Sequence, residues 1–181
     1  MSAMIDRIFD LFARFGDSGY GEDLSLGQHM LQSAALAEAL GGSNSVIVAA
    51  LLHDIGYFLQ AEATGDADPG RDFAHESLGA AWLSRGFDEA VTAPIALHVA
   101  AKRYLCATET GYFDLLSAAS KLSLSVQGGV MNAAEAEAFS RRAGFEAALL
   151  LRRCDDQGKD AALPTQTVDA YRPRLTALLR G

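Results

Sequence analysis

A strongly apolar segment of this chain, VIVAALL at 46–52, runs directly into two titratable residues, His53 and Asp54. A segment so apolar belongs in a protein interior, where an imidazole or a carboxylate without a partner is strongly unfavourable. The fold must therefore bring something to this pair that satisfies both groups. Gly56 follows two residues later and predicts the end of the helix that contains the segment.

Apolar residues recur with the period of an α-helix along almost the whole chain. Ile5, Ile8, Phe9, Phe12 and Phe15 form a first stripe that ends at Gly16, and a polar loop is predicted at 16–24. Ser25 and Gln28 have the spacing of a capping box before a helix that reaches Leu40. Further helices are predicted from Ser43 or Ser45 to Gly56 and over 75–85, 94–105, 113–126, 132–143, 145–157 and 168–179, with Pro94 in the first turn of its helix. No segment alternates convincingly as a strand does, so we predict one all-α domain over 1–181, a bundle of about eight helices.

Composition and charge narrow the class of protein. Half of the 181 residues are hydrophobic and 21% are charged, which is typical of a globular chain. The net charge of −8 argues against a nucleic-acid or anionic-membrane partner. Cys106 and Cys154 have no metal or redox spacing, and no signal peptide or membrane-spanning run is recognisable. We therefore expect a cytoplasmic protein, whose oligomeric state the sequence does not indicate.

The four histidines of the chain, His29, His53, His75 and His98, follow one another at intervals of 22 to 24 residues. In an antiparallel bundle this interval is one helix plus one connection, so successive helices can present the imidazoles to a common interior. Imidazole is the commonest protein ligand of metals, and a neighbouring carboxylate adds an oxygen donor. A single histidine is more often an ordinary core or surface residue. Four at this spacing, one of them beside Asp54, predict a metal site.

The order His29, His53-Asp54 and a late Asp155 resembles the H…HD…D signature of the HD-domain superfamily, whose fold is a helical metal-binding bundle. The resemblance covers the chain from about Tyr20 to Lys159. The dinuclear branches of this superfamily carry two further histidines, to which His75 and His98 correspond. It implies that Asp54 bridges two metal ions. One ion would then be held by His29, His53 and Asp155, and the other by His75 and His98. Asp156 could take the place of Asp155 as the last ligand. We prefer Asp155, because Arg152 and Lys159 both lie about one helical turn from it.

Most HD proteins hydrolyse phosphate esters, but a branch similar to inositol oxygenase uses a mixed-valent pair of irons to activate O2, and some of its members cleave phosphonates. The loop YGEDLSLGQH resembles a loop of those members that carries a tyrosine and a glutamate. Glu22 has the family spacing, seven residues before His29, whereas Tyr20 is displaced by one position. The resemblance implies that Tyr20 caps one iron until substrate arrives and that Glu22 meets an ammonium group. The alternative is that both are ordinary loop residues.

Several polar side chains near the predicted ligands could bind an anion. Lys102 lies four residues after His98, on the same helical face. Together with Arg152 and Lys159 it would suit a phosphonate dianion, since an arginine can grip two oxygens at once. The segment SKLSLSVQGG adds hydroxyl and amide groups that resemble donors of the same pocket: Ser120, Ser123 and Gln127. The alternative is that these are solvated side chains of amphipathic helices.

Tyr57 stands where many relatives have the second histidine of HD-x-G-H. This departure weakens the hydrolase interpretation, and an aromatic ring could attract a trimethylammonium group by about 0.5–2 kcal/mol. The alternative is that Tyr57 packs at a helix end.

The resemblance implies an oxygenase with an Fe(II)/Fe(III) pair and O2 as cosubstrate, in which Asp54, Tyr20 and Glu22 are catalytic. Its zwitterionic substrate would be 1-hydroxy-2-(trimethylammonio)ethylphosphonate or 2-amino-1-hydroxyethylphosphonate, and carbon–phosphorus cleavage would give glycine betaine or glycine plus phosphate. A metal-dependent phosphohydrolase of a small phosphate ester or nucleotide, or a non-catalytic HD module, are the alternatives.

Overall fold

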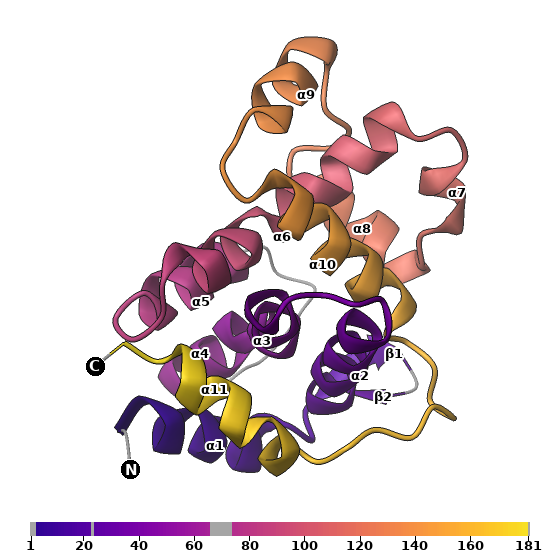
Figure 1. The fold of residues 1–181 in the computed structure, drawn as a ribbon. Helices are drawn as coiled ribbons and strands as arrows, with labels where there is room; N and C mark the ends of the chain where they lie inside the picture. Colours follow the sequence, from indigo (N-terminus) through magenta and orange to yellow (C-terminus); the bar gives the residue numbers. More distant parts are fainter. Residues whose placement is uncertain (1–2, 23, 66–73, 181) are drawn as a thin grey trace.

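The computed structural model describes residues 3–22, 24–65 and 74–180, which form eleven α-helices, one 3-10 helix and one small hairpin (Figure 1). The helices are α1 (Ala3–Phe15), α2 (Leu26–Ala39), α3 (Asn44–Leu52), α4 (Ile55–Thr64), α5 (His75–Leu83), α6 (Glu89–Thr108), α7 (Tyr112–Leu115), α8 (Ala118–Val126), α9 (Ala133–Ser140), α10 (Phe145–Gln157), η1 (Val168–Tyr171) and α11 (Arg172–Leu178). The all-α class is confirmed. The helices outnumber the eight or so predicted because several predicted segments are divided by a cap or a break.

The segment predicted as a loop before α2 is a hairpin of strands β1 (Gly19–Glu22) and β2 (Leu24–Ser25), paired antiparallel. Strands of four and two residues are too short to show an alternating pattern, so these strands were not predicted. The strand β2 runs directly into α2. Ser25 Oγ accepts from the Gln28 backbone N–H at 3.3 Å, and the Gln28 side chain accepts from the Ser25 N–H at 3.0 Å, so the predicted capping box is confirmed.

The prediction that a helix stops at Gly56 is wrong. The helix α3 ends at Leu52 and α4 begins at Ile55, so His53 and Asp54 occupy a break between them. Gly56 lies inside α4, where a Cβ atom would come within 2.0 Å of the His75 carbonyl oxygen. A glycine is therefore required at this position because the backbones of α4 and α5 come close together, and not because a helix ends there.

Pro94 also lies deeper in its helix than predicted. Because α6 begins at Glu89, Pro94 is its sixth residue and removes one hydrogen bond from the helix interior. The predicted helix over 113–126 is divided at Ser117, whose hydroxyl accepts from the Ser120 N–H at 3.1 Å and caps α8. The last predicted helix starts as the 3-10 turn η1.

The helices α2, α3, α6 and α10 pack against one another at the centre of the molecule (Figure 1). The interior helix is α3, whose residues from Val48 to Leu52 are all fully buried. The helices α1 and α11 lie beside each other and cover α4 and α3, and α5 packs on α4 and α6. This arrangement brings the end of α3 to the middle of the bundle, with α2, α5, α6 and α10 around it.

One stretch, Asn44–Thr64, has the length and composition of a membrane-spanning helix, which the sequence had not led us to expect. The structure divides it into α3 and α4, and 78% of its most apolar window is buried within the protein. Its apolar character is therefore explained by its place in the core.

Candidate metal centre

The four histidines come together from four elements around one point. His29 lies on α2, His53 directly after α3, His75 at the start of α5 and His98 on α6. Asp54 follows His53, and α10 contributes Asp155. All six side chains are buried, with exposed fractions of 4% or less. The break between α3 and α4 is what places the His53-Asp54 pair at the point where these helices meet.

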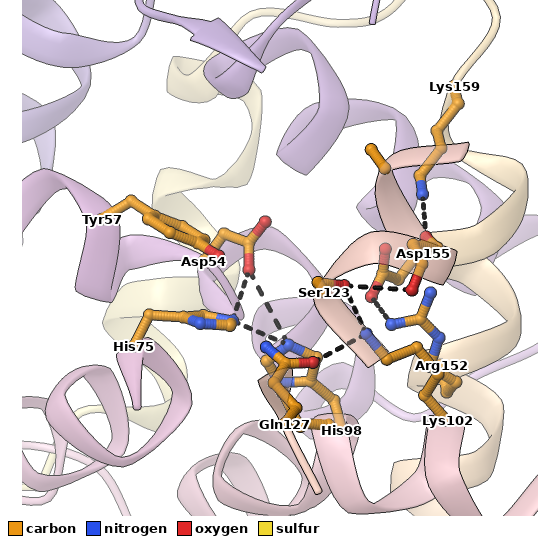
Figure 2. Close-up of a pocket in the computed structure, with 13 residues that line it drawn as sticks. Asp54, Tyr57, His75, His98, Lys102, Ser123, Gln127, Arg152, Asp155 and Lys159 are labelled. Atoms are coloured by element: carbon orange, nitrogen blue, oxygen red, sulfur yellow. Dashed lines mark hydrogen bonds and ion pairs between the residues drawn. The ribbon is translucent and has the colours of Figure 1, made fainter. Parts of the chain in front are cut away.

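The carboxylate of Asp54 lies between two pairs of imidazoles. Its Oδ2 is 3.6 Å from His29 Nε2 and 3.4 Å from His53 Nε2. Its Oδ1 is 3.2 Å from His75 Nε2 and 3.8 Å from His98 Nε2, as Figure 2 shows for this second pair. Two groups of three potential ligand atoms result, His29–His53–Asp54 and Asp54–His75–His98, each with its atoms within 4.8 Å of one another. A carboxylate has two oxygens, so Asp54 can belong to both groups.

The hydrogen bonds behind the imidazoles show that the residues fit metal ions. The Nδ1 atoms of His29, His53 and His98 each lie 2.8 Å from a backbone carbonyl oxygen. A carbonyl only accepts, so each Nδ1 carries the proton and, in a neutral imidazole, Nε2 carries a lone pair. The Nε2 atoms of His29 and His53 are nevertheless 3.1 Å apart. Two lone pairs facing each other at this distance need a cation or a proton between them.

The sixth residue of the cluster, Asp155, adds a further donor on the His29 side. Its Oδ1 lies 3.4 Å from His29 Nε2, and its Oδ2 lies 3.9 Å from His53 Nε2. Within the described residues, Asp155 Oδ1 is buried and has no hydrogen-bond partner. A buried carboxylate oxygen in this state is normally satisfied by a donor or a cation. The site therefore holds four nitrogen and at least two oxygen donors suited to iron and other divalent metals.

The charges of the cluster also favour a cation. Burial opposes the ionisation of Asp54, but the charge and hydrogen bond of His53 outweigh it and hold the pKa of Asp54 well below its ordinary value. Burial likewise opposes the charged form of His53, yet the nearby Asp54 raises the pKa of His53 to about 9. For His98, burial and the charge of His75 lower the pKa. A metal ion beside Asp54 would supply the positive charge that a proton on His53 otherwise provides.

A cavity of about 50 Å³ adjoins the cluster and is lined by Asp54, Asp155, Tyr57 and the predicted anion-binding residues. Lys102 Nζ donates to Ser123 Oγ and to Gln127 Oε1, both at 2.7 Å. On the same side, Lys159 Nζ donates to Ser120 Oγ at 2.9 Å. Figure 2 shows these lysines and Arg152 across the cavity from Tyr57 and His75. Burial and the charge of Arg152 lower the pKa of Lys102 to about 8.

Comparisons with known proteins agree with this geometry. The HD domain family model matches residues 26–110, a span that includes the four histidines and Asp54. The chain is 38% identical over 177 residues to [1-hydroxy-2-(trimethylamino)ethyl]phosphonate dioxygenase (glycine-betaine-forming) of Leisingera caerulea, covering 97% of this chain and 90% of the relative. It is 40% identical over 176 residues to hydroxymethylphosphonate dioxygenase of Gimesia maris, covering 97% and 88%. The chain belongs to the family of HD-domain phosphonate dioxygenases.

Within this phosphonate dioxygenase fold, the two adjacent aspartates of α10 have different surroundings. Asp155 faces the histidines, whereas Asp156 pairs with Arg152 and accepts a hydrogen bond from the Tyr112 hydroxyl. Arg152 also lies 2.7 Å from Asp155 Oδ2, so its two terminal nitrogens are both engaged by carboxylates. Arg152 also lines the cavity, and its binding of a substrate stays a prediction. Sequence reasoning missed Tyr112 altogether, because nothing in its spacing connects it to the ligands.

The remaining predicted site residues differ in what the structure describes. Tyr57 is 5% exposed and stacks on the His75 ring with centroids 4.3 Å apart and an angle of 18° between the planes, so one face of its ring is covered. Tyr20 and Glu22 belong to strand β1, but their side chains lie outside the described part of the structure. Their capping and ammonium-binding roles stay predictions.

Proposed function

We propose that this chain is an O2-dependent oxygenase that uses two iron ions to cleave the carbon–phosphorus bond of a small 1-hydroxyphosphonate. The observation that carries the proposal is Asp54, whose two oxygens each face a separate pair of histidines beside a cavity lined with lysines. Both relatives reported above are named as dioxygenases of hydroxyphosphonates. The preferred substrates are 1-hydroxy-2-(trimethylammonio)ethylphosphonate and 2-amino-1-hydroxyethylphosphonate.

The chain's own residues bind and orient such a substrate. Lys102 has three N–H bonds and donates two of them to Ser123 and Gln127, so the third can reach a phosphonate oxygen. Lys159 and Ser120 offer a second contact on the same side of the cavity. A water molecule needs about 10–15 Å³ of such space, so the cavity of about 50 Å³ has room for the phosphonate end of such a substrate.

The metal pair would be held by His29, His53 and Asp155 on one side and by His75 and His98 on the other, with Asp54 shared. An Fe(II)/Fe(III) pair in this position would activate O2, which is the oxidant of the reaction. The overall reaction balances as R–CH(OH)–PO3²⁻ plus O2 giving R–COO⁻, HPO4²⁻ and a proton. The carbon–phosphorus and carbon–hydrogen bonds break, and O2 accepts the four electrons. One O2 is therefore consumed for each phosphate released.

The substrate's amine end is assigned to the Tyr57 side of the cavity. Tyr57 lines the cavity and stacks on His75, and the electron-rich ring of a tyrosine attracts a trimethylammonium group. Glu22 would add a negative charge for the same group, and Tyr20 would cap the open iron before substrate binds. We place the enzyme in the cytoplasm, in line with its two free thiols, Cys106 and Cys154.

The decisive experiment compares phosphate release with and without O2. Iron-loaded protein is incubated with each of three compounds, the two preferred substrates and hydroxymethylphosphonate, while phosphate and dissolved O2 are measured. We expect equal amounts of phosphate and O2, and no phosphate under anaerobic conditions. Lys102→Met should abolish turnover, while Lys121→Met, which changes a lysine outside the cavity, should not. Phosphate release that continues without O2 would overturn the oxygenase proposal, and fewer than two metals per chain would favour a non-catalytic module.

A further inference from the structure

The buried guanidinium of Arg152 is divided between two neighbouring carboxylates. Only 3% of Arg152 is exposed. Its Nη1 lies 2.7 Å from Asp155 Oδ2, and its Nη2 donates to Asp156 Oδ1. The second oxygen of Asp156 accepts from the hydroxyl of Tyr112, which is itself buried in an apolar cluster with Leu105, Leu116 and Leu124. A chain of contacts therefore leads from this cluster to one of the expected metal ligands.

The division of Arg152 between two partners matters because arginine commonly pairs with both oxygens of a single carboxylate. If Arg152 paired with Asp155 in that way, it would occupy Oδ1, the oxygen that lies 3.4 Å from His29 Nε2. In the described part of the chain, this buried oxygen has no hydrogen-bond partner. By engaging Nη2, Asp156 restricts Arg152 to the other oxygen of Asp155.

We propose that Asp156 and Tyr112 are positioning residues that hold Arg152 on Oδ2 of Asp155 and so keep Oδ1 available to a metal ion. The inference rests on the proposed function, because it assumes a metal beside His29, His53 and Asp155. It also gives the two adjacent aspartates separate tasks: Asp155 binds the ion, and Asp156 fixes the cation that partly neutralises Asp155. Neither Asp156 nor Tyr112 lines the cavity itself.

Metal binding by Asp156→Asn tests the proposal, because asparagine removes the charge with little change of shape. Metal-free protein is titrated with Mn(II), free Mn(II) is followed by EPR, and thermal unfolding is recorded in parallel. We expect the wild type to bind two equivalents. The variant should bind one equivalent as tightly as the wild type and the other about 10- to 100-fold more weakly, the usual range for residues that orient a ligand. A merely structural role would lower the unfolding midpoint without weakening one equivalent selectively, and that result overturns the proposal.

Two further variants make the test independent of the folding of Asp156→Asn. Tyr112→Phe keeps the ring in its apolar cluster and removes only the hydroxyl, and it should weaken the same equivalent by a smaller factor. Glu109→Gln is the matched control, because it removes the exposed carboxylate partner of the next arginine along α10, Arg153, at 2.6 Å. It should bind both equivalents as the wild type does.

The outcomes separate this proposal from the proposed function. If the wild type binds two Mn(II) ions but the iron-loaded enzyme releases no phosphate, the proposed function fails, while selective weakening in Asp156→Asn still supports the positioning role. If the enzyme is active and both Asp156→Asn and Tyr112→Phe bind two ions with wild-type affinity, the positioning role is overturned and the function stands. Fewer than two ions in the wild type overturns both.

Discussion

Replacing Gly56 by alanine tests whether the metal centre depends on the close contact between α4 and α5. A Cβ atom at this position would lie 2.0 Å from the His75 carbonyl oxygen and 2.9 Å from the His75 Cα atom. Ordinary contact begins at 3.4 Å, so the two backbones must separate by about 1.4 Å, the difference between these distances. Overpacking costs about 1–3 kcal/mol. We take the upper end, because backbone atoms cannot rotate out of the way.

Alanine has a higher helix propensity than glycine, which offsets about 1 kcal/mol of this cost. The expected net loss in the free energy of unfolding is therefore about 2 kcal/mol. In a chain of this length, such a loss lowers the unfolding midpoint by about 4–8 °C. The separation also moves His75, whose Nε2 is 3.2 Å from Asp54 Oδ1, so the metal held by His75 and His98 should bind more weakly.

Circular dichroism melting curves and metal content per chain measure the two effects. Gly79→Ala is the graded control, because it lies at the same contact of α4 and α5 but its nearest atoms would be 3.2 Å away. A small adjustment relieves that contact, and we expect a change within about 1 kcal/mol. A Gly56→Ala protein that melts at the wild-type temperature and retains two metals would refute the reasoning.

Three other perturbations follow from the site. Because burial and Arg152 lower the pKa of Lys102 to about 8, the protonated form that binds an anion is lost as the pH rises through that value; KM for the phosphonate should rise above pH 8 while kcat changes less. Tyr57→Leu should raise KM for the trimethylammonium substrate by about 2- to 30-fold, the equivalent of 0.5–2 kcal/mol, whereas KM for hydroxymethylphosphonate, which has no ammonium group, should not change. His29→Ala should reduce the bound metal from two ions to one, measured by elemental analysis; two tightly bound ions in this variant would contradict the ligand assignment.

The sequence was informative about the centre because regular spacing along helices translates directly into proximity in a bundle. His29, His53, His75 and His98 needed no long-range information beyond one helix and one connection each. The role of Arg152 could not be inferred in the same way. Asp155 and Asp156 both pair with its guanidinium, and only the positions of their oxygens in space show which nitrogen each of them binds. Spacing places Arg152 equally well beside a substrate and beside Asp155 or Asp156. The contribution of Tyr112 depends on α7, a helix of four residues between α6 and α8, whose position relative to Asp156 does not follow from its spacing in the sequence.

The break after α3 explains how two adjacent residues can serve one centre. Successive side chains of a continuous helix point about 100° apart, so His53 and Asp54 would diverge if α3 continued to Gly56. Instead α3 ends at Leu52, and Asp54 adopts φ −101° and ψ 10° before α4 begins. In this conformation His53 Nε2 and Asp54 Oδ2 lie 3.4 Å apart, while Asp54 Oδ1 faces His75. The close contact at Gly56, two residues beyond the histidine–aspartate pair, then holds α5 against this turn. This glycine therefore helps to place His75 beside Asp54.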